Sequence, residues 1–234
     1  QIMALRFIEN NNGSISDMVQ AIDYAIAEGA QVINASYGSE AYNSSEFSAI
    51  TRALNAGIMM VAAVGNGGTD YLGDNTDSTP FYPAGYNRSN IIAVGATDRN
   101  DSRASFSNFG ATSVDLMAPG VEMWSTTTGS NSSYTQGQGT SYAAPIVSGA
   151  LALLIAEYPN DSVSTLREKI LSTNAVDLIP ALNGLCVTGG RLNLAKLLPP
   201  NTNPLAVANA WHLPFNQETQ ISSTMRNPTN SVTT

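Results

Sequence analysis

Residues 31–64 read QVINASYGSEAYNSSEFSAITRALNAGIMMVAAV, and this stretch decides the fold. Two short apolar runs of strand length, Gln31 to Ala35 and Ile58 to Val64, flank a segment from about Ser45 to Asn55 with helical spacing. A helix between two strands carries the chain back to the starting edge of the sheet, so the two strands run parallel. The sequence therefore predicts a β-α-β unit in a sheet that is buried on both faces.

The segments on both sides continue this alternation. Upstream, Ile2 to Ile8 has a strand-like pattern, and Ser14 or Ser16 is placed to cap a helix that ends near Gly29. The polar stretches 65–88 and 127–138 are predicted loops. Downstream we expect three short strands at 91–96, 113–117 and 121–125. A buried helix is expected at 140–158, followed by two shorter helices at 162–173 and 191–198.

Together these elements predict a three-layer α/β sandwich with a mainly parallel sheet and the helix from residue 140 buried on one face. A short antiparallel piece is expected between about residues 81 and 125. The predicted domain covers residues 1–198. Residues 199–234 hold five of the eleven prolines and many Asn and Thr, which is typical of a tail or linker.

Composition excludes several classes of function. Ten Lys plus Arg against eighteen Asp plus Glu give a formal charge of −8 without a basic cluster, so nucleic acid is not an expected partner. The longest apolar runs, at 58–64 and 151–156, are far shorter than the roughly 20 residues that span a bilayer, and no membrane span is expected. The single cysteine, Cys186, excludes an internal disulfide and a multi-cysteine metal site.

The sharpest local motif is GTSYAAP at residues 139–145, where a polar loop meets the long apolar helix. A serine at this position, Ser141, lies beside the unpaired N–H groups of the helix start, where the dipole favours negative charge. That setting suits a nucleophile whose reaction develops an oxyanion, although an ordinary N-capping serine has the same local sequence. Pro145 falls within the first turns, where its missing N–H costs little.

This motif resembles the GTSMAxP nucleophile motif of the subtilisin-like serine endopeptidases. Four further stretches are similar to family segments and follow in the family's order: QVINASYG at 31–38, VAAVGNG at 61–67, YPA at 82–84 with IIAVGA at 91–96, and RASFSNFG at 103–110 with DLMAPG at 115–120. The resemblance covers residues 1 to about 198. It implies the subtilisin-like fold and hydrolysis of peptide bonds in peptide or protein substrates.

The resemblance also implies roles for individual residues. Ser141 would be the nucleophile, and Asn66 would form the oxyanion hole together with the Ser141 backbone N–H. The substrate backbone would lie between two strand edges that flank the primary specificity pocket. Tyr37 suggests some narrowing or aromatic contact on one side of the groove. The residues on these edges are Ser36, Tyr37 and Gly38 on one side, and Ala63, Val64 and Gly65 on the other.

The sequence departs from the family pattern in the rest of the catalytic machinery. The family's aspartate and histidine lie on segments that precede all of the matched motifs, and neither segment is found here. The sole histidine, His212, lies in the proline-rich tail, and Ile146 stands where family members usually carry a second, non-catalytic histidine. We therefore expect that the N-terminal part of the domain is missing and that an Asp- and His-bearing portion or chain is the partner. This chain alone is expected to be inactive, with an unpaired sheet edge that lowers its stability or promotes association.

Three alternatives remain open at this point. An α/β-hydrolase uses the chain order serine, aspartate, histidine, which Ser141, Asp177 and His212 match, but the G-x-S-x-G elbow of that fold is absent. A non-catalytic pseudoprotease would keep the peptide groove without cutting its ligand. A split protease would work with a second chain that carries the missing groups.

Cofactors and location follow only from the resemblance and from composition. Catalysis by such a serine needs no metal or organic cofactor. Structural calcium is common in the family: the carbonyls near Ala84 and Tyr86 match a weak family cation position, and the carboxylates of Asp70, Asp74 and Asp77 offer calcium ligands in one loop. The family and the acidic, lysine-poor composition predict an extracellular, secreted protein.

Overall fold

A computed structural model of the chain describes residues 1–9, 12–130 and 132–198. Its centre is a six-stranded sheet with the strand order β3-β4-β5-β6-β10-β9, in which only the pair β10 and β9 is antiparallel. The strands are β3 (Val32–Ala35), β4 (Met59–Ala63), β5 (Ile91–Thr97), β6 (Leu116–Pro119), β9 (Val176–Leu178) and β10 (Gly190–Leu192). The mainly parallel sheet predicted from the sequence is confirmed.

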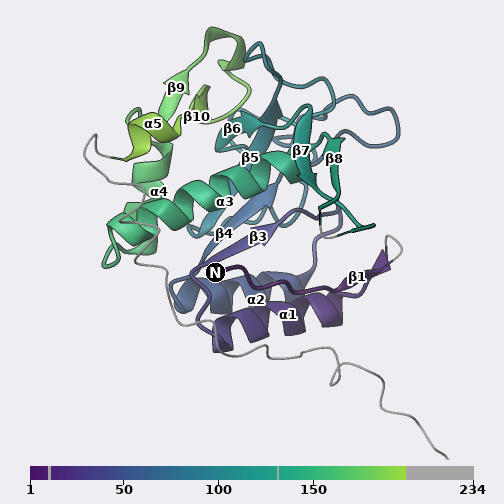
Figure 1. Cartoon of the computed structure of the whole chain (residues 1–234), viewed down its shortest axis with the longest axis vertical. Coiled ribbons are helices and arrows are strands. Elements are labelled where there is room, and N and C mark those ends of the chain that lie inside the picture. The colour runs from purple at the N-terminus through teal and green to yellow at the C-terminus, as the bar shows by residue number, and fades with distance from the viewer. Residues whose placement is uncertain (10–11, 131, 199–234) are drawn as a thin grey trace, which may run out of the picture.

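Helices cover both faces of this sheet (Figure 1). On one face lie α1 (Ile15–Ala27) and α2 (Ser44–Asn55), and on the other lie α3 (Thr140–Glu157) and α4 (Val163–Leu171). A single turn of 3-10 helix (Pro180–Leu182) and the short helix α5 (Leu194–Leu197) complete the C-terminal end of the described chain. The structure therefore has the predicted three layers.

Strand β4 shows how the sequence produces two separate cores. Met59, Val61 and Ala63 pack in the cluster that contains α3, whereas Met60 and Ala62 pack in the cluster that contains α1 and α2. Successive side chains of a strand point to opposite faces, so an unbroken apolar run fills both cores at once. The cores join at the sheet, which fixes the position of α3 relative to the ends of β3 and β4.

Short polar signals define where α1 and α2 begin and where the chain turns after them. The side chains of Ser14 and Asn43 cap the two helices by accepting hydrogen bonds from backbone N–H groups in the first turn. Gly29 and Gly57 follow the two helices with φ angles of 71° and 77°, a left-handed conformation that glycine adopts without steric cost. The sequence predicted the Ser14 cap and the two glycines, whereas the Asn43 cap was not predicted.

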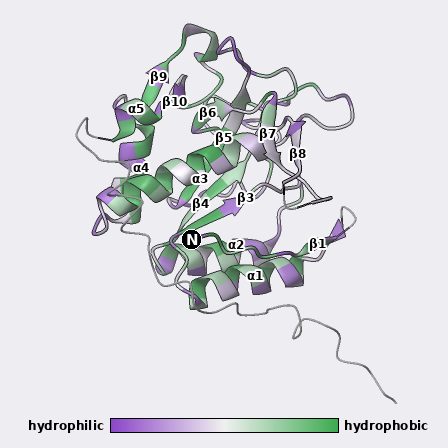
Figure 2. Ribbon diagram, viewed as in Figure 1, coloured by the Kyte–Doolittle hydropathy of each residue, from purple (hydrophilic) through white to green (hydrophobic). Residues whose placement is uncertain are grey.

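Helix α3 has the length and composition of a short membrane span, but its environment is that of a core helix. It lies against strands β3 to β6, and 44% of it is buried inside the protein. Figure 2 shows hydrophobic residues along α3 and along the strands that it covers. The apolar character of this helix is therefore explained by packing against the sheet.

Several predicted elements are corrected by the structure. Residues 2–7 form no strand, and the only strand near them is β1 (Ile8–Glu9), which pairs with β2 (Asn12–Gly13) in a small hairpin. An apolar run becomes a strand only where a neighbour completes its hydrogen-bond ladder, and none of the described strands lies beside residues 2–7. The tail assigned to residues 199–234 lies outside the described residues.

The antiparallel part of the structure also differs from the prediction. Near the predicted range 81–125, antiparallel pairing is found in the hairpin of β7 (Met123–Thr126) and β8 (Tyr134–Gly137) and in a single bridge between Thr97 and Arg103. A strand therefore occupies part of a predicted loop, whereas β5 inside that range pairs in parallel with its neighbours in the sheet. The strands β9 and β10 were not predicted. At three residues each they are too short for a periodic signal, and β10 together with α5 replaces the helix expected over 191–198.

Strand β3 ends the sheet. Its outer edge has no partner among the described strands, and Val32 and Ile33 are only half-buried although both are apolar. The unpaired edge expected from the sequence is thus present in the described part of the chain. Its expected consequence, association or low stability, remains a prediction.

An ion pair ties the α4 side of the sandwich to the sheet. The carboxylate of Asp115 is almost fully buried, accepts a hydrogen bond of 2.8 Å from the Ala93 N–H in β5, and pairs with the guanidinium of Arg167 in α4. The Arg167 side chain also donates to the carbonyl of Ile91. These contacts join two layers of the sandwich. The buried Asp115 carboxylate is stabilised by the positive charge of Arg167.

Arg167→Leu is expected to lower the free energy of unfolding by about 3 to 5 kcal/mol, because it leaves the Asp115 carboxylate buried and unpaired. Arg99→Leu is the matched control, since Arg99 pairs with Glu122 at the exposed surface, and its loss should cost less than about 1 kcal/mol. Urea denaturation of the two variants measures both values. Equal losses in the two variants would contradict the role given to Arg167.

Candidate active site

The site begins with the backbone at the start of α3. Gly139 is the N-cap residue of this helix, has a φ angle of 146° and donates its N–H to the Gly120 carbonyl at 2.8 Å. Thr140 and Ser141 are the first two residues of the helix, so their N–H groups precede the first helical hydrogen bonds. The sequence Gly-Thr-Ser thus places Ser141 at the positive end of a core helix.

Thr140 connects this helix start to the end of β4. Its hydroxyl accepts a hydrogen bond from the Gly65 N–H at 3.2 Å and donates one to the Oδ1 atom of Asn66 at 2.9 Å. Its backbone N–H donates to the same Oδ1 atom, also at 2.9 Å. The Thr140 side chain is completely buried. Because two donors hold Oδ1, the carboxamide of Asn66 has a fixed orientation, and its Nδ2 group remains available as a donor.

Two N–H donors lie beside Gly139. Among the described residues, neither the Ser141 N–H nor the Asn66 Nδ2 group has a hydrogen-bond acceptor. A Cβ atom placed on Gly139 would stand 3.4 Å from Asn66 Nδ2 and 3.7 Å from the Ser141 nitrogen. A backbone N–H at a helix start and a side-chain amide are the kinds of donor that bind small anions or developing oxyanions.

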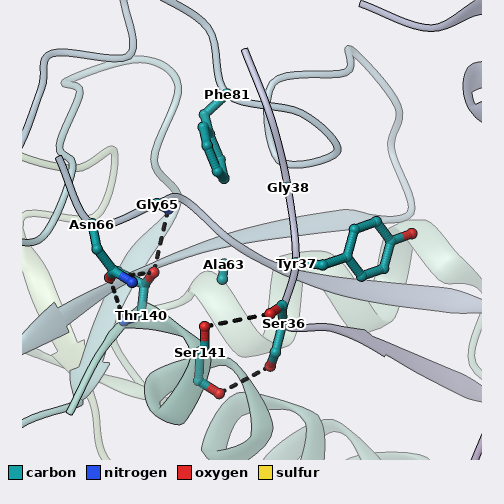
Figure 3. Close-up of a pocket in the computed structure, with 9 residues that line it drawn as sticks. All are labelled: Ser36, Tyr37, Gly38, Ala63, Gly65, Asn66, Phe81, Thr140 and Ser141. Carbon is teal, nitrogen blue, oxygen red and sulfur yellow. Dashed lines mark hydrogen bonds between the residues drawn. The ribbon is translucent and has the colours of Figure 1, made fainter. Parts of the chain in front are cut away.

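Ser141 is bound to Ser36 at the end of β3 (Figure 3). The Ser36 hydroxyl donates to the Ser141 carbonyl at 2.9 Å, and the Ser141 hydroxyl donates to the Ser36 carbonyl at 3.4 Å. The second bond is long and weak, so the Ser141 hydroxyl is readily released to another acceptor. The predicted nucleophile is thus half-buried at the rim of a pocket, next to the predicted oxyanion donors.

The ends of β3 and β4 enclose this pocket, whose volume is about 210 Å³. Seven of the eight residues named from the sequence line it, namely Ser36, Tyr37, Gly38, Ala63, Gly65, Asn66 and Ser141. Val64 does not, because its side chain is buried in the core beneath α1 and α2. Thr140 and Phe81 line the pocket without having been named from the sequence.

The two aromatic residues at the pocket have opposite orientations. The ring of Tyr37 points away from the pocket, so the expectation that it narrows the groove is wrong, and the ring of Phe81 points into the pocket instead (Figure 3). Tyr37 packs against Phe7 with 4.9 Å between ring centroids. Phe81 lies in a loop without periodicity, and its only sequence signal is its position directly before the family-like segment Tyr82, Pro83 and Ala84.

A buried carboxyl group supports Tyr37 from α2. Glu46 is almost fully buried and accepts a hydrogen bond of 2.8 Å from the Tyr86 hydroxyl. Burial raises the pKa of Glu46, while hydrogen bonding with Tyr86 and Tyr37 opposes that rise. Burial also raises the pKa of Tyr37, an effect that the neighbouring Glu46 increases. All of these groups are therefore held in their neutral forms more strongly than in water.

The structure rules out the α/β-hydrolase arrangement for Asp177. This residue lies on β9, at the opposite edge of the sheet from β3, where its carboxylate pairs with Lys196 at 2.6 Å and Arg191 at 3.2 Å. Hydrogen bonds from Lys196 and Asn193 lower the pKa of Asp177. His212 lies outside the described residues, and the described part of the chain contains no histidine.

The three carboxylates suggested as calcium ligands accept hydrogen bonds from different backbone N–H groups. Asp70 accepts from the Leu72 N–H, and Asp74 accepts from the Gly68 N–H. Asp77 accepts from the backbone N–H groups of Thr112 and Ser113. Within the described residues they form no cluster of metal-binding side chains. This loop therefore does not fit a carboxylate-bound calcium ion, and calcium at other positions remains a prediction.

Comparisons with known proteins find a matching family and similar proteins. The sequence model of the subtilase family matches residues 1–204. The chain is 44% identical over 162 residues to the thermophilic serine proteinase of Bacillus sp. (strain AK1), a match that covers 69% of this chain and 37% of that protein. It is 40% identical over 164 residues to subtilisin DY of Bacillus licheniformis, covering 70% of this chain and 57% of that protein.

A solved structure shows the same fold. The prenylagaramide maturation protease PagA matches with a TM-score of 0.66 and 26% sequence identity, over 82% of this chain and 69% of that one. Against the two curated relatives, this chain spans 37% and 57% of their length. The likeness therefore concerns a part of those proteins.

Thr140→Val should lower the free energy of unfolding by about 1 to 3 kcal/mol, because it leaves the buried Gly65 N–H without its side-chain acceptor. Thr140→Ser keeps the hydroxyl and should retain most of that stability. Chemical denaturation of both variants tests this difference. A serine variant as unstable as the valine variant would show that the methyl group, and not the hydrogen bonds, is the important part of Thr140.

Glu46→Gln should change how stability depends on pH. Because burial raises the folded-state pKa of Glu46, the folded protein binds more protons than the unfolded chain, and stability falls as pH rises above about 4.3, the ordinary glutamate value. The glutamine variant cannot ionise and should lose this part of the decline. Thermal unfolding between pH 4 and pH 8 measures it, with the exposed Glu40→Gln as control. Identical pH profiles for Glu46→Gln and the unmodified chain would refute the effect.

Proposed function

This chain belongs to the subtilase family, and on that premise we propose that it carries the nucleophile and the oxyanion-binding part of a serine endopeptidase site. The observation that carries the proposal is the grouping of the Ser141 hydroxyl with two donors, the Ser141 N–H and Asn66 Nδ2, at one end of an open pocket; neither donor has an acceptor in the part of the chain that the structure describes. A serine beside preorganised donors is the arrangement that acyl transfer requires.

In the proposed reaction, the Ser141 Oγ atom attacks the carbonyl carbon of the scissile peptide bond while a histidine base takes its proton. The carbonyl oxygen becomes an oxyanion and receives hydrogen bonds from the Ser141 N–H and Asn66 Nδ2. The C–N bond then breaks as the base gives its proton to the leaving amine, which leaves an ester on Ser141. Water attacks this ester by the same route, releasing the acid and restoring the hydroxyl.

The base and the aspartate that orients it must come from outside the described residues. We propose that an Asp- and His-bearing portion, on the same gene product or on another chain, completes the site. Strand β3 offers it a position, because its outer edge is unpaired among the described strands and its end carries Ser36, which contacts Ser141. Without that portion the Ser141 hydroxyl has no base, so the chain alone should be inactive.

The proposed substrate is an extended peptide held between the ends of β3 and β4. Main-chain groups near Ser36 and Gly38 on one side, and near Ala63 and Gly65 on the other, line the pocket and suit recognition of a peptide backbone. The proposed mechanism uses no metal or organic cofactor. An extracellular location is part of this proposal and rests on the family and on the acidic composition.

A second candidate is a non-catalytic peptide-binding protein or one half of a split protease. The specific observation in its favour is that the described residues retain an intact pocket but contain no histidine. Peptide binding without hydrolysis in every form of the protein would support the binding protein. Restoration of hydrolysis only by a separate chain would support the split protease.

The test is labelling of Ser141 by a fluorophosphonate, together with peptide hydrolysis, with and without the Asp- and His-bearing portion. The chain alone should show background labelling, and the completed protein should be labelled and active. In subtilisins, losing the nucleophilic serine lowers kcat about 10⁶-fold, and losing the oxyanion asparagine lowers it about 10²- to 10³-fold. We adopt these magnitudes for Ser141→Ala and Asn66→Ala.

Ser148→Ala is the matched control, because Ser148 lies on the same helix but binds Asn34 and the Ala144 carbonyl outside the pocket. It should keep full labelling and activity. Hydrolysis that survives Ser141→Ala would show that Ser141 is not the nucleophile. A completed protein that binds peptide but is neither labelled nor active would leave the peptide-binding protein as the function.

A further inference from the structure

We infer that Phe81 limits the residue on the acyl side of the scissile bond to one with a small uncharged side chain, such as glycine, alanine or serine. The position of a scissile bond rests on the proposed function, whereas the size of the pocket is independent of it. The inference follows from where the Phe81 ring lies, what holds it there and what space it leaves.

The ring of Phe81 lies against two glycines, one at each edge of the pocket. A Cβ atom placed on Gly38 would stand 2.3 Å from Cε1 of this ring, and one placed on Gly65 would stand 3.2 Å from its Cδ1 and Cε1 atoms. The first distance is a severe overlap. The ring therefore lies between the two strand ends (Figure 3). The Tyr82 carbonyl stands beside it at Gly38, and the Asn108 side chain stands beside it at Gly65.

The backbone around Phe81 is fixed to the same strand end. Tyr82 and Ser39 form an antiparallel bridge, with N–H to carbonyl distances of 2.7 and 2.9 Å, and the Phe81 carbonyl accepts from the Gly85 N–H at 2.7 Å. Moving the Cα atom of Phe81 away from the pocket would break these bonds. The backbone that carries the ring is thus fixed directly beside Gly38.

The remaining space is small and uncharged. The cavity of about 210 Å³ includes the region beside Ser141 and Asn66, and none of its nine lining residues is acidic or basic. Pockets that take drug-sized ligands measure about 300 to 1,000 Å³. A large side chain entering from the Ser141 end would meet the Phe81 ring, and overpacking of this kind costs free energy. Small residues avoid that contact.

The first experiment measures binding and requires no catalysis. Two tetrapeptides that differ only in a C-terminal alanine or phenylalanine are titrated into the full chain by calorimetry, since their carboxylate can meet the Ser141 N–H and Asn66 donors. We expect the alanine peptide to bind about 10- to 200-fold more tightly, the usual range for size discrimination in an apolar pocket. Phe81→Ala should lower this ratio at least about 10-fold, and Phe81→Leu should give an intermediate ratio.

Trp124→Ala serves as the control, because Trp124 is an exposed aromatic residue of β7 that does not line the pocket. It should leave the ratio unchanged. Circular dichroism shows whether each variant is folded. If Phe81→Ala is not, Phe81→Leu decides the question, because it keeps an apolar side chain while removing the ring.

The second experiment repeats the comparison as kcat/KM for matched p-nitroanilide peptides, using the protein completed with its Asp- and His-bearing portion. The inference is overturned if folded Phe81 variants keep the original ratio, if the unmodified chain prefers phenylalanine, or if neither peptide binds. If any of these three results is obtained while Ser141 is still labelled by the fluorophosphonate, the proposed function stands. If the binding ratios are as expected but no form of the protein hydrolyses peptide, the role of Phe81 in the pocket is supported and the proposed endopeptidase activity is overturned.

Discussion

The arrangement of the site depends on the buried hydroxyl of Thr140. It joins the start of α3 to the end of β4 by accepting from the Gly65 N–H and donating to Asn66. The helix and the strand belong to different layers, and the hydroxyl acts together with the Thr140 backbone N–H, which donates to Asn66, and with the bonds between Ser141 and Ser36. A buried hydroxyl with both partners in place is rigid, because leaving either partner unpaired costs free energy.

This link is possible because the sheet is parallel. In a β-α-β unit the ends of neighbouring strands meet at one edge, and here that edge holds Ser36 after β3 and Gly65 after β4. Helix α3 packs across both strands and directs its N-terminus to the same place. The positions of the pocket, of Ser141 and of the Asn66 amide are therefore consequences of a single topological arrangement.

Two aromatic residues at the same edge have different environments in the structure. Tyr37 and Phe81 are both aromatic and adjacent to the pocket, but Tyr37 packs against Phe7 and the core that contains α1 and α2, while the Phe81 ring lies beside two glycines. A side chain at Gly38 would overlap both the Phe81 ring and the Tyr82 carbonyl. The unpaired edge of β3 lies beside them and is the natural place for a further strand.

The sequence by itself determined the three-layer fold, the parallel strands β3 to β6, the long buried helix, the family and seven of the eight residues brought together at the pocket. The spacing of apolar residues, the helix caps and the short motifs depend on residues close together in the chain, so they can be read from the sequence alone. Only the tertiary structure decided the orientation of Tyr37, the place of Phe81, the burial of Val64, the bond network of Thr140 and the lack of a strand at residues 2–7. Each of these depends on a neighbour distant in the chain, because a side chain's direction and a strand's existence are set by what packs or pairs beside them.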